Sequence, residues 1–280
     1  MRDRGIGALC ALALLAVPAG ATETARQILD RQRQLDRTER HWSDRHQQLT
    51  MEVVDASHAP RRLTLDLFDK KYPSDEQRTI AYFSAPDSVK GTAFLAITRP
   101  DREADQWLFL PEYQRARRIG GAVRKQGFVG TDFTYHDLDL LAAMPSWTEA
   151  DAAAALEGET TLDGTPCFVI ALTPRRADIG YARIVLWLGK EDLVARQVEF
   201  FEEAPASGWI GSGAATPTRR LKQGDVRRAG AIPVAYRAEV ETPSAGSKTT
   251  VTFGEVTFDR GLPDELFTQP AMEWGRYQTP

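Results

Sequence analysis

The sequence is poor in cysteine and histidine, which narrows the chemistry open to it. Its 280 residues include 2 cysteines and 4 histidines. Cys10 lies in an apolar N-terminal run, so a chain that loses this run has no internal partner for Cys167. Cys167 stands in the apolar stretch 165–172, which favours a buried small side chain over a reactive thiol.

Common catalytic and metal-binding motifs are also missing. Ile210 stands where a G-x-S-x-G motif around Ser212 needs a glycine, and there is no glycine-rich phosphate loop and no H-E-x-x-H. His41 and His46 are five residues apart, a spacing that suits one metal ion on neither a helix face nor a strand face. We therefore expect no metal, no cofactor and no enzymatic activity.

One cluster of titratable residues, Asp132, His136 and Asp137, has a spacing that a general acid-base pair could use. The simpler interpretation has Asp132 capping a turn and His136 exposed on a short helix. We favour the simpler interpretation.

Long apolar runs are scarce as well. The run 5–17 is about a dozen residues long, short of the roughly 20 that a membrane-spanning helix needs. It follows Arg2 and Arg4 and precedes the small residues 19–21, a pattern typical of a secretory signal peptide cut after Ala21. The sequence thus predicts a signal peptide over 1–21 and a mature secreted chain over 22–280. A membrane anchor is the alternative.

The chain is mildly acidic, with a formal net charge of −4, which argues against nucleic acid as a partner. No linker or internal repeat divides residues 22–280, so we expect a single domain.

Most of that domain alternates apolar and polar residues with the period of a β-strand. Leu63, Leu65 and Leu67 are an example, and turn dipeptides such as Asp163-Gly164 separate the runs. We predict a mainly β fold with a few helices and an antiparallel sheet of about eleven strands joined by short hairpins. A sheet this wide must curl, close or split.

Three helices are predicted around this sheet. Residues 22–35 carry an apolar stripe, and Thr24 with Gln27 forms a potential capping box. A short helix is expected over 135–141 after Thr134, and another over 263–267 that opens with Pro263.

The stretch 83–138 is the most informative part of the chain. It contains Phe83-Ser-Ala-Pro86, then Lys90-Gly-Thr-Ala-Phe-Leu95, then the strand Trp107-Leu-Phe-Leu-Pro111. A basic run over 115–119 follows, and the tail 128–138 is rich in aromatic and acidic residues. This combination resembles the outer-membrane lipoprotein-sorting protein family, the relatives of the carrier LolA. Val129 and His136 depart from the family pattern.

The resemblance implies an open half-barrel whose concave side is closed by helices. It implies a periplasmic carrier that shelters the acyl chains of a lipoprotein or lipid in a hydrophobic cavity, with transient membrane contact. An inner-membrane RND-type transporter is a possible partner. The alternative is an RseB-like periplasmic regulatory module that binds a partner protein. Whether the interior is hollow or filled by side chains stays open from the pattern alone.

Candidate site residues come from the matching stretch. We expect the cavity wall to contain seven apolar side chains: Phe94, Leu95, Trp107, Phe109, Phe128, Phe133 and Tyr135. Arg117 and Arg118 are candidates for the cavity mouth or a partner contact. The same basic run could instead be a solvated edge hairpin, or pair with Asp101, Glu103 and Asp105.

Overall fold

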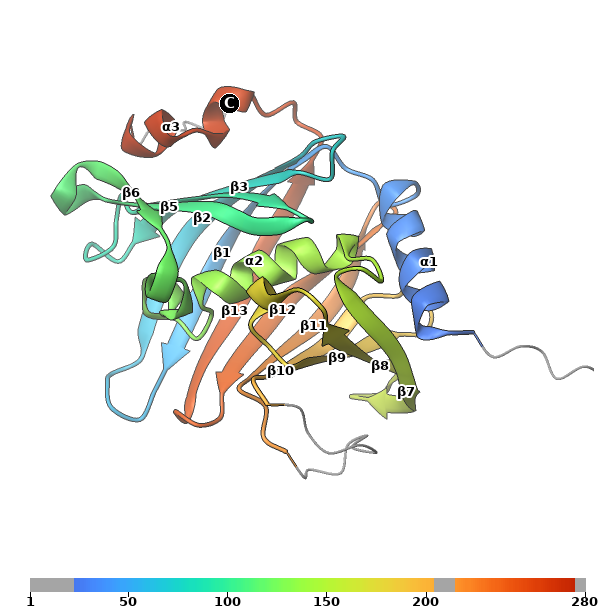
Figure 1. Ribbon diagram of the computed structural model, residues 1–280. Helices are drawn as coiled ribbons and strands as arrows, with labels where there is room; N and C mark the ends of the chain where they lie inside the picture. Colours follow the sequence, from blue (N-terminus) through green and yellow to red (C-terminus); the bar gives the residue numbers. More distant parts are fainter. Residues whose placement is uncertain (1–22, 204–214, 275–280) are drawn as a thin grey trace, which may run out of the picture.

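The strands of this computed structural model form a single antiparallel sheet (Figure 1). The structure describes residues 23–203 and 215–274. Within these residues the sheet has thirteen strands in the order β6-β5-β4-β3-β2-β1-β13-β12-β11-β10-β9-β8-β7. Neighbours in the sheet are neighbours in the chain everywhere except at β1 and β13. The sheet therefore consists of two meanders joined by the β1–β13 pair.

The first meander contains β1 (Asp44–Val54), β2 (Arg61–Lys71), β3 (Gln77–Ala85), β4 (Ala93–Arg99), β5 (Arg102–Leu110) and β6 (Arg115–Ile119). The second contains β7 (Ala152–Leu162), β8 (Thr165–Pro174), β9 (Arg183–Gly189), β10 (Ala195–Phe201), β11 (Arg219–Ala229), β12 (Ile232–Thr242) and β13 (Ser247–Phe258). The helices are α1 (Ala25–Arg37), α2 (Tyr135–Ala143) and α3 (Gln269–Trp274). Short 3-10 turns are η1 (Pro111–Tyr113), η2 (Gly121–Lys125), η3 (Phe128–Gly130), η4 (Met144–Ser146), η5 (Ala177–Ile179) and η6 (Asp264–Phe267).

The sequence underestimates the number of strands, and β6 explains part of the difference. Its residues, Arg-Ala-Arg-Arg-Ile, show no apolar alternation because β6 lies at the edge of the sheet and pairs on one side only, with β5. Charged side chains on an edge strand discourage pairing with another chain, so this composition fits its position.

Helix α1 begins where the capping pattern predicts. The Thr24 side chain accepts a hydrogen bond from the backbone of Gln27, and the Gln27 side chain accepts one from the backbone of Thr24. Ala25 and Ile28 on its apolar stripe are buried. Among the described helices, none is long and apolar enough to cross a membrane.

The crossover, residues 120–151, runs from the end of β6 to the start of β7 and carries α2 across one face of the sheet (Figure 1). Thr134 caps α2 in a second capping box, this time with Asp137. The crossover is the long connection between the two meanders, which are otherwise built of hairpins.

A buried carboxylate, that of Asp139, attaches the crossover to the first meander. Asp139 pairs with Arg124 at 2.5 Å and accepts a hydrogen bond at 2.9 Å from the backbone of Ala104 in β5. Arg124 also donates to the carbonyl oxygen of Ala104 at 3.0 Å. Each charge is thus met by its opposite or by a backbone group, as a buried ion requires.

Two more buried carboxylates attach the crossover to the second meander. Asp137 accepts a hydrogen bond at 2.6 Å from Tyr181 and pairs with Arg219 of β11 at 3.1 Å. Asp132 accepts hydrogen bonds from Thr242, Ser247 and Thr249, on β12 and β13. The crossover is therefore fixed to both halves of the sheet.

The interpretation of His136 as an exposed residue is wrong. Its ring is half-buried, stacks on Tyr181 at 6.0 Å between centroids, and one ring nitrogen lies 2.8 Å from the carbonyl oxygen of Ile179. Asp132 is likewise buried by strands of the second meander. Asp132, His136 and Asp137 therefore help to hold the crossover against the second meander.

The two faces of the sheet carry separate apolar clusters. The α2 face carries the larger one, which continues from Phe94 in β4 to Leu188 in β9. On the opposite face, Leu95 and Phe109 pack under Phe267 and Met272 of the C-terminal η6–α3 segment. Figure 1 shows α3 of this segment on the side of the sheet away from α2. Cys167 is a buried free thiol, as its apolar surroundings predict.

We predict that Asp132→Ala lowers the free energy of unfolding by about 2–4 kcal/mol, because it leaves the buried hydroxyl of Thr249 and the half-buried hydroxyls of Thr242 and Ser247 without their acceptor. Denaturant unfolding measures this. Glu255→Ala, which removes an exposed carboxylate from β13, is the control and should cost no more than about 0.5 kcal/mol. Equal losses for the two variants would contradict the proposed anchoring.

Candidate functional site

A cavity of about 950 Å³ lies on the α2 face of the sheet. Its floor comes from both meanders and is apolar: Leu49, Met51, Leu65, Ala81, Phe94, Ala96, Leu172, Leu188, Val198 and Val251. This volume is at the large end of the range for small-molecule sites.

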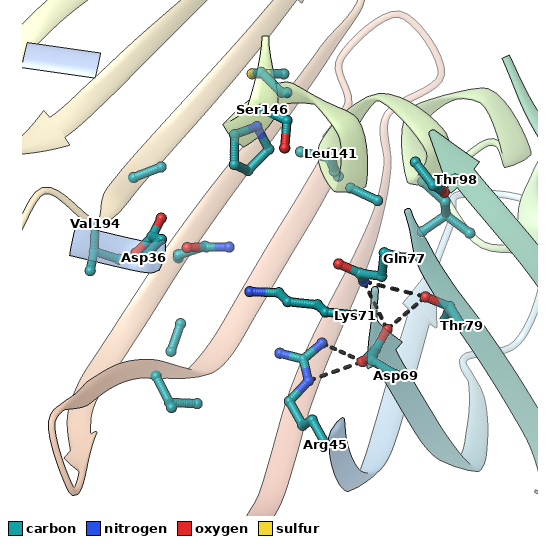
Figure 2. A pocket seen from close by; sticks show the side chains of 18 of the residues that line it. Asp36, Arg45, Asp69, Lys71, Gln77, Thr79, Thr98, Leu141, Ser146 and Val194 are labelled. Atoms are coloured by element: carbon teal, nitrogen blue, oxygen red, sulfur yellow. Dashed lines mark hydrogen bonds and ion pairs between the residues drawn. The ribbon is translucent and has the colours of Figure 1, made fainter. Parts of the chain in front are cut away.

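Helices α1 and α2 supply the opposite wall. Leu29 of α1 and Leu138 and Leu141 of α2 line the cavity and are only half-buried. Figure 2 shows Leu141 at the cavity. Apolar side chains on the core face of a helix would be fully buried if the interior were filled. Their partial exposure is therefore consistent with a hollow beneath the helices.

One end of the cavity is polar (Figure 2). Asp69 of β2 is buried there and accepts hydrogen bonds from Arg45 at 2.6 and 3.0 Å. It also accepts hydrogen bonds from Gln77 at 3.0 Å and from Thr79 at 2.6 Å. These contacts fix the side chains of three neighbouring strands in one network.

At this end, burial disfavours the charged forms of two side chains, the carboxylate of Asp36 and the ammonium group of Lys71. Burial raises the pKa of Asp36, against the opposing effects of Arg40 and Lys71. Burial also lowers the pKa of Lys71, although the nearby carboxylate of Asp36 acts in the other direction. Lys71 extends into the pocket, with its Nζ 4.0 Å from the centroid of the Trp42 ring (Figure 2).

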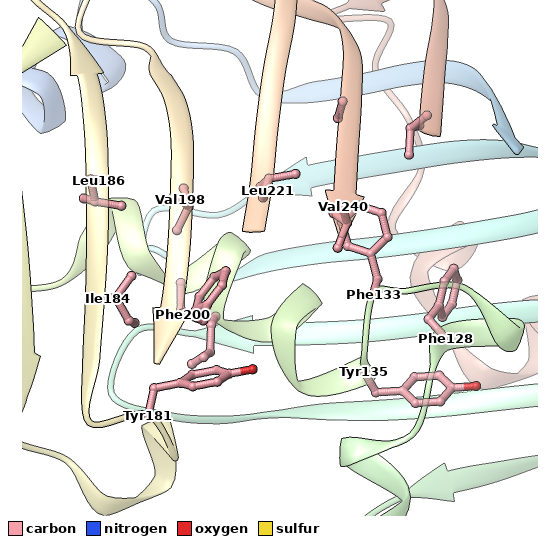
Figure 3. Packing of buried hydrophobic residues seen from close by; sticks show 14 of the residues in the cluster. Phe128, Phe133, Tyr135, Tyr181, Ile184, Leu186, Val198, Phe200, Leu221 and Val240 are labelled. Carbon is pink, nitrogen blue, oxygen red and sulfur yellow. The ribbon is translucent and has the colours of Figure 1, made fainter. Parts of the chain in front are cut away.

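Three of the seven expected wall residues line the cavity: Phe94 from β4, and Phe128 and Phe133 from the crossover. Tyr135 lies behind them and packs on Phe94 and Phe128, with ring centroids 5.8 and 5.6 Å apart (Figure 3). It supports the wall without lining it.

The other three, Leu95, Trp107 and Phe109, belong to the opposite face of the sheet and require a correction. They pack in the cluster that the C-terminal segment covers. Strands β4 and β5 are apolar on both faces in this region, so alternation alone could not say which side faces the cavity.

Arg117 and Arg118 lie on the edge strand β6 and do not line this cavity, which is a second correction. Arg118 pairs with Asp105 at 2.5 Å, the contact that the sequence offered as an alternative. The guanidinium of Arg117 lies 4.4 Å from the Tyr113 ring centroid. The charged residues of the cavity end come instead from α1, the loop that follows it, β1 and β2.

Sequence reasoning missed Arg40, Arg45, Asp69 and Lys71 at the polar end. The available indication was the run Asp69-Lys70-Lys71, which ends the apolar alternation of β2. Within the described residues no group of His, Cys, Asp and Glu side chains could hold a metal ion.

Comparisons with solved structures identify the fold as LolA-like, the fold of the outer-membrane lipoprotein-sorting protein domain. A DUF1329 family protein from Desulfovibrio piger aligns with a TM-score of 0.76 and 21% identity, over 89% of this chain and 97% of that one. A putative outer membrane lipoprotein-sorting protein domain from Vibrio parahaemolyticus gives 0.73 and 21%, over 88% and 99%. A LolA superfamily protein from Nitrosomonas europaea gives 0.63 and 16%, over 89% and 99%.

The model of one protein family, described as "Uncharacterized protein", matches residues 75–274. This is well over half of the chain, and the chain belongs to that family. No curated protein matches the sequence.

The cavity gives a prediction about two alanines of β4. Ala96 faces the cavity, whereas Ala93 is fully buried under the C-terminal segment. Ala93→Leu should overpack a closed cluster and lower the free energy of unfolding by about 1–3 kcal/mol. Ala96→Leu extends into free volume and should cost less than about 1 kcal/mol. Denaturant unfolding of both variants makes the comparison, and an equal cost would argue that the interior is solid.

Proposed function

We propose that this protein is a periplasmic carrier that shelters the acyl chains of a lipoprotein or lipid and transfers them between envelope membranes. The cavity of about 950 Å³ with an apolar floor carries the proposal. Each buried methylene contributes about 0.8 kcal/mol, so burying about ten of them contributes about 8 kcal/mol. That corresponds to a dissociation constant of about 1 μM, before the costs of binding.

The sheet in this proposal curves into a half-barrel around the cargo. Phe94 of β4 and Leu188 of β9 line the same cavity, although they stand eight strands apart in the sheet. In a flat sheet, eight steps of about 4.8 Å would separate them by about 38 Å. Their presence in one cavity supports a curved sheet, with α1 and α2 over its hollow side.

The cellular location in this proposal rests on the sequence. The signal peptide expected over 1–21 lies outside the described residues, and its pattern supports export and a mature domain over 22–280. The names of the Vibrio and Nitrosomonas neighbours agree with a role in lipoprotein sorting, but likenesses of 21% and 16% identity support the fold alone. An RND-type transporter as partner rests only on the resemblance of the stretch 83–138.

We predict that the protein purified from its native envelope carries lipid, and that Leu141→Glu reduces the lipid-to-protein ratio at least about ten-fold. A carboxylate in the cavity wall either loses its hydration against an acyl chain or keeps water in the cavity, and both outcomes oppose binding. Mass spectrometry of the extracted lipid measures the ratio.

Val123→Glu is the matched control, because Val123 is exposed on η2 and outside the cavity. It should keep the lipid content of the unmodified protein. An empty cavity in the unmodified protein, together with one dominant co-purifying inner-membrane protein, would instead favour the RseB-like regulatory alternative.

A further inference from the structure

The cavity changes from apolar to polar along the strands that form its floor. On β2, Leu65, Leu67, Asp69 and Lys71 are spaced two residues apart, and all four line the cavity. Because alternate residues of a strand point to the same face, this one strand presents two leucines and then two charges along the cavity floor.

The next two strands, β3 and β4, change from apolar to polar toward the same end of the cavity. In the register of β2 with β3, Leu67 is opposite Ala81, Asp69 is opposite Thr79 and Lys71 is opposite Gln77. In the register of β3 with β4, Thr79 is opposite Ala96 and Gln77 is opposite Thr98. Three strands thus place their polar residues at the same end, which makes the floor complementary to a molecule with one apolar and one polar end.

The charges at the polar end favour an anion. Three cations, Arg40, Arg45 and Lys71, face two carboxylates, Asp36 and Asp69, which leaves an excess of one positive charge. The other charges on this part of the rim are paired: Arg37 with Asp75 at 2.5 Å, and Glu76 with Arg78 and Arg99 at 2.8 and 2.9 Å.

Two of the three cations, Arg40 and Lys71, have hydrogen-bond donors that no side chain of the described residues accepts. Arg45 is occupied by Asp69. The nearest contact between Arg40 and Asp36 is 3.9 Å, which is too long for a hydrogen bond. Within the described residues, the ammonium group of Lys71 contacts the ring of Trp42 and makes no hydrogen bond.

We infer that the cargo is an amphiphile with an anionic head group, a phosphate or a carboxylate, bound by Lys71 and Arg40 while its acyl chain lies along the apolar floor. This inference rests on the proposed carrier function and adds the chemical class of the cargo. It favours an anionic lipid over an acylated protein whose lipid anchor carries no charge.

Because Lys71 is partly buried, its contact with the head group contributes more to the binding free energy than the same contact in water would. Lys71 has lost part of its hydration, as the lowered pKa reflects, and a ligand anion replaces the lost water with a charge-assisted hydrogen bond. Asp36 is the carboxylate that competes with the ligand, since it lies near both Arg40 and Lys71. Removing its charge should therefore strengthen the binding of the head group.

Calorimetric titration of the delipidated protein with two lipids tests the inference. Palmitoyl lysophosphatidic acid and palmitoylglycerol share one acyl chain and differ in the phosphate. We expect Lys71→Met to weaken lysophosphatidic acid about ten-fold or more and to leave palmitoylglycerol within about two-fold. Asp36→Asn should strengthen lysophosphatidic acid alone. Lys125→Met, an exposed lysine outside the cavity, is the control and should change neither affinity.

The outcomes separate this inference from the carrier function. Equal affinity of the unmodified protein for the two lipids, or an equal loss of both in Lys71→Met, would overturn the head-group site and leave the carrier intact. Failure of both lipids to bind the unmodified protein would overturn both proposals. Palmitate as a third titrant distinguishes a carboxylate from a phosphate head group. Inorganic phosphate alone, if it bound as tightly as the lipid, would contradict an amphiphile as the cargo.

Discussion

The structure depends on the attachment of a single crossover to both halves of the sheet. Three acidic side chains of this segment, Asp132, Asp137 and Asp139, are buried, and each meets a cation, a hydroxyl or a backbone donor from a strand or a neighbouring loop. Buried charges are tolerated only with such partners, so these contacts define one position for the crossover and for α2. The helix then covers the sheet at a fixed height.

That fixed height explains how an apolar interior can stay hollow. The larger apolar cluster extends from the first meander to the second, but among the described helices only α1 and α2 cover it. Leucines on both helices and on the floor are left facing a volume that their own side chains do not fill. Atoms lining such a volume lack dispersion partners, and a bound acyl chain would supply them. The same contacts between an acyl chain and the cavity lining would therefore both bind the chain and stabilise the folded protein.

The sequence predicts the helices and most of the strands well. It predicts poorly which face of the sheet a given side chain occupies. Capping residues placed α1 and α2, and alternation located most strands. The arginines of β6 show no alternation, so the sequence predicts this edge strand only as one of three alternatives for the basic run, the solvated edge hairpin. The sequence places Leu95 and Phe109 in the cavity wall, whereas both lie on the other face, because β4 and β5 are apolar on both sides and the C-terminal segment that covers them is distant in sequence. The role of Lys71 depends on strand register, which determines which polar residues of β2, β3 and β4 meet at one end.

The most direct test is a crystal structure of the protein isolated from the cells that make it, with no lipid added. We predict continuous density for a hydrocarbon chain between α2 and the sheet, in contact with Phe94 and Leu141, and an anionic group beside Lys71. An interior closed by side chains, with no space for a row of methylenes, would contradict it.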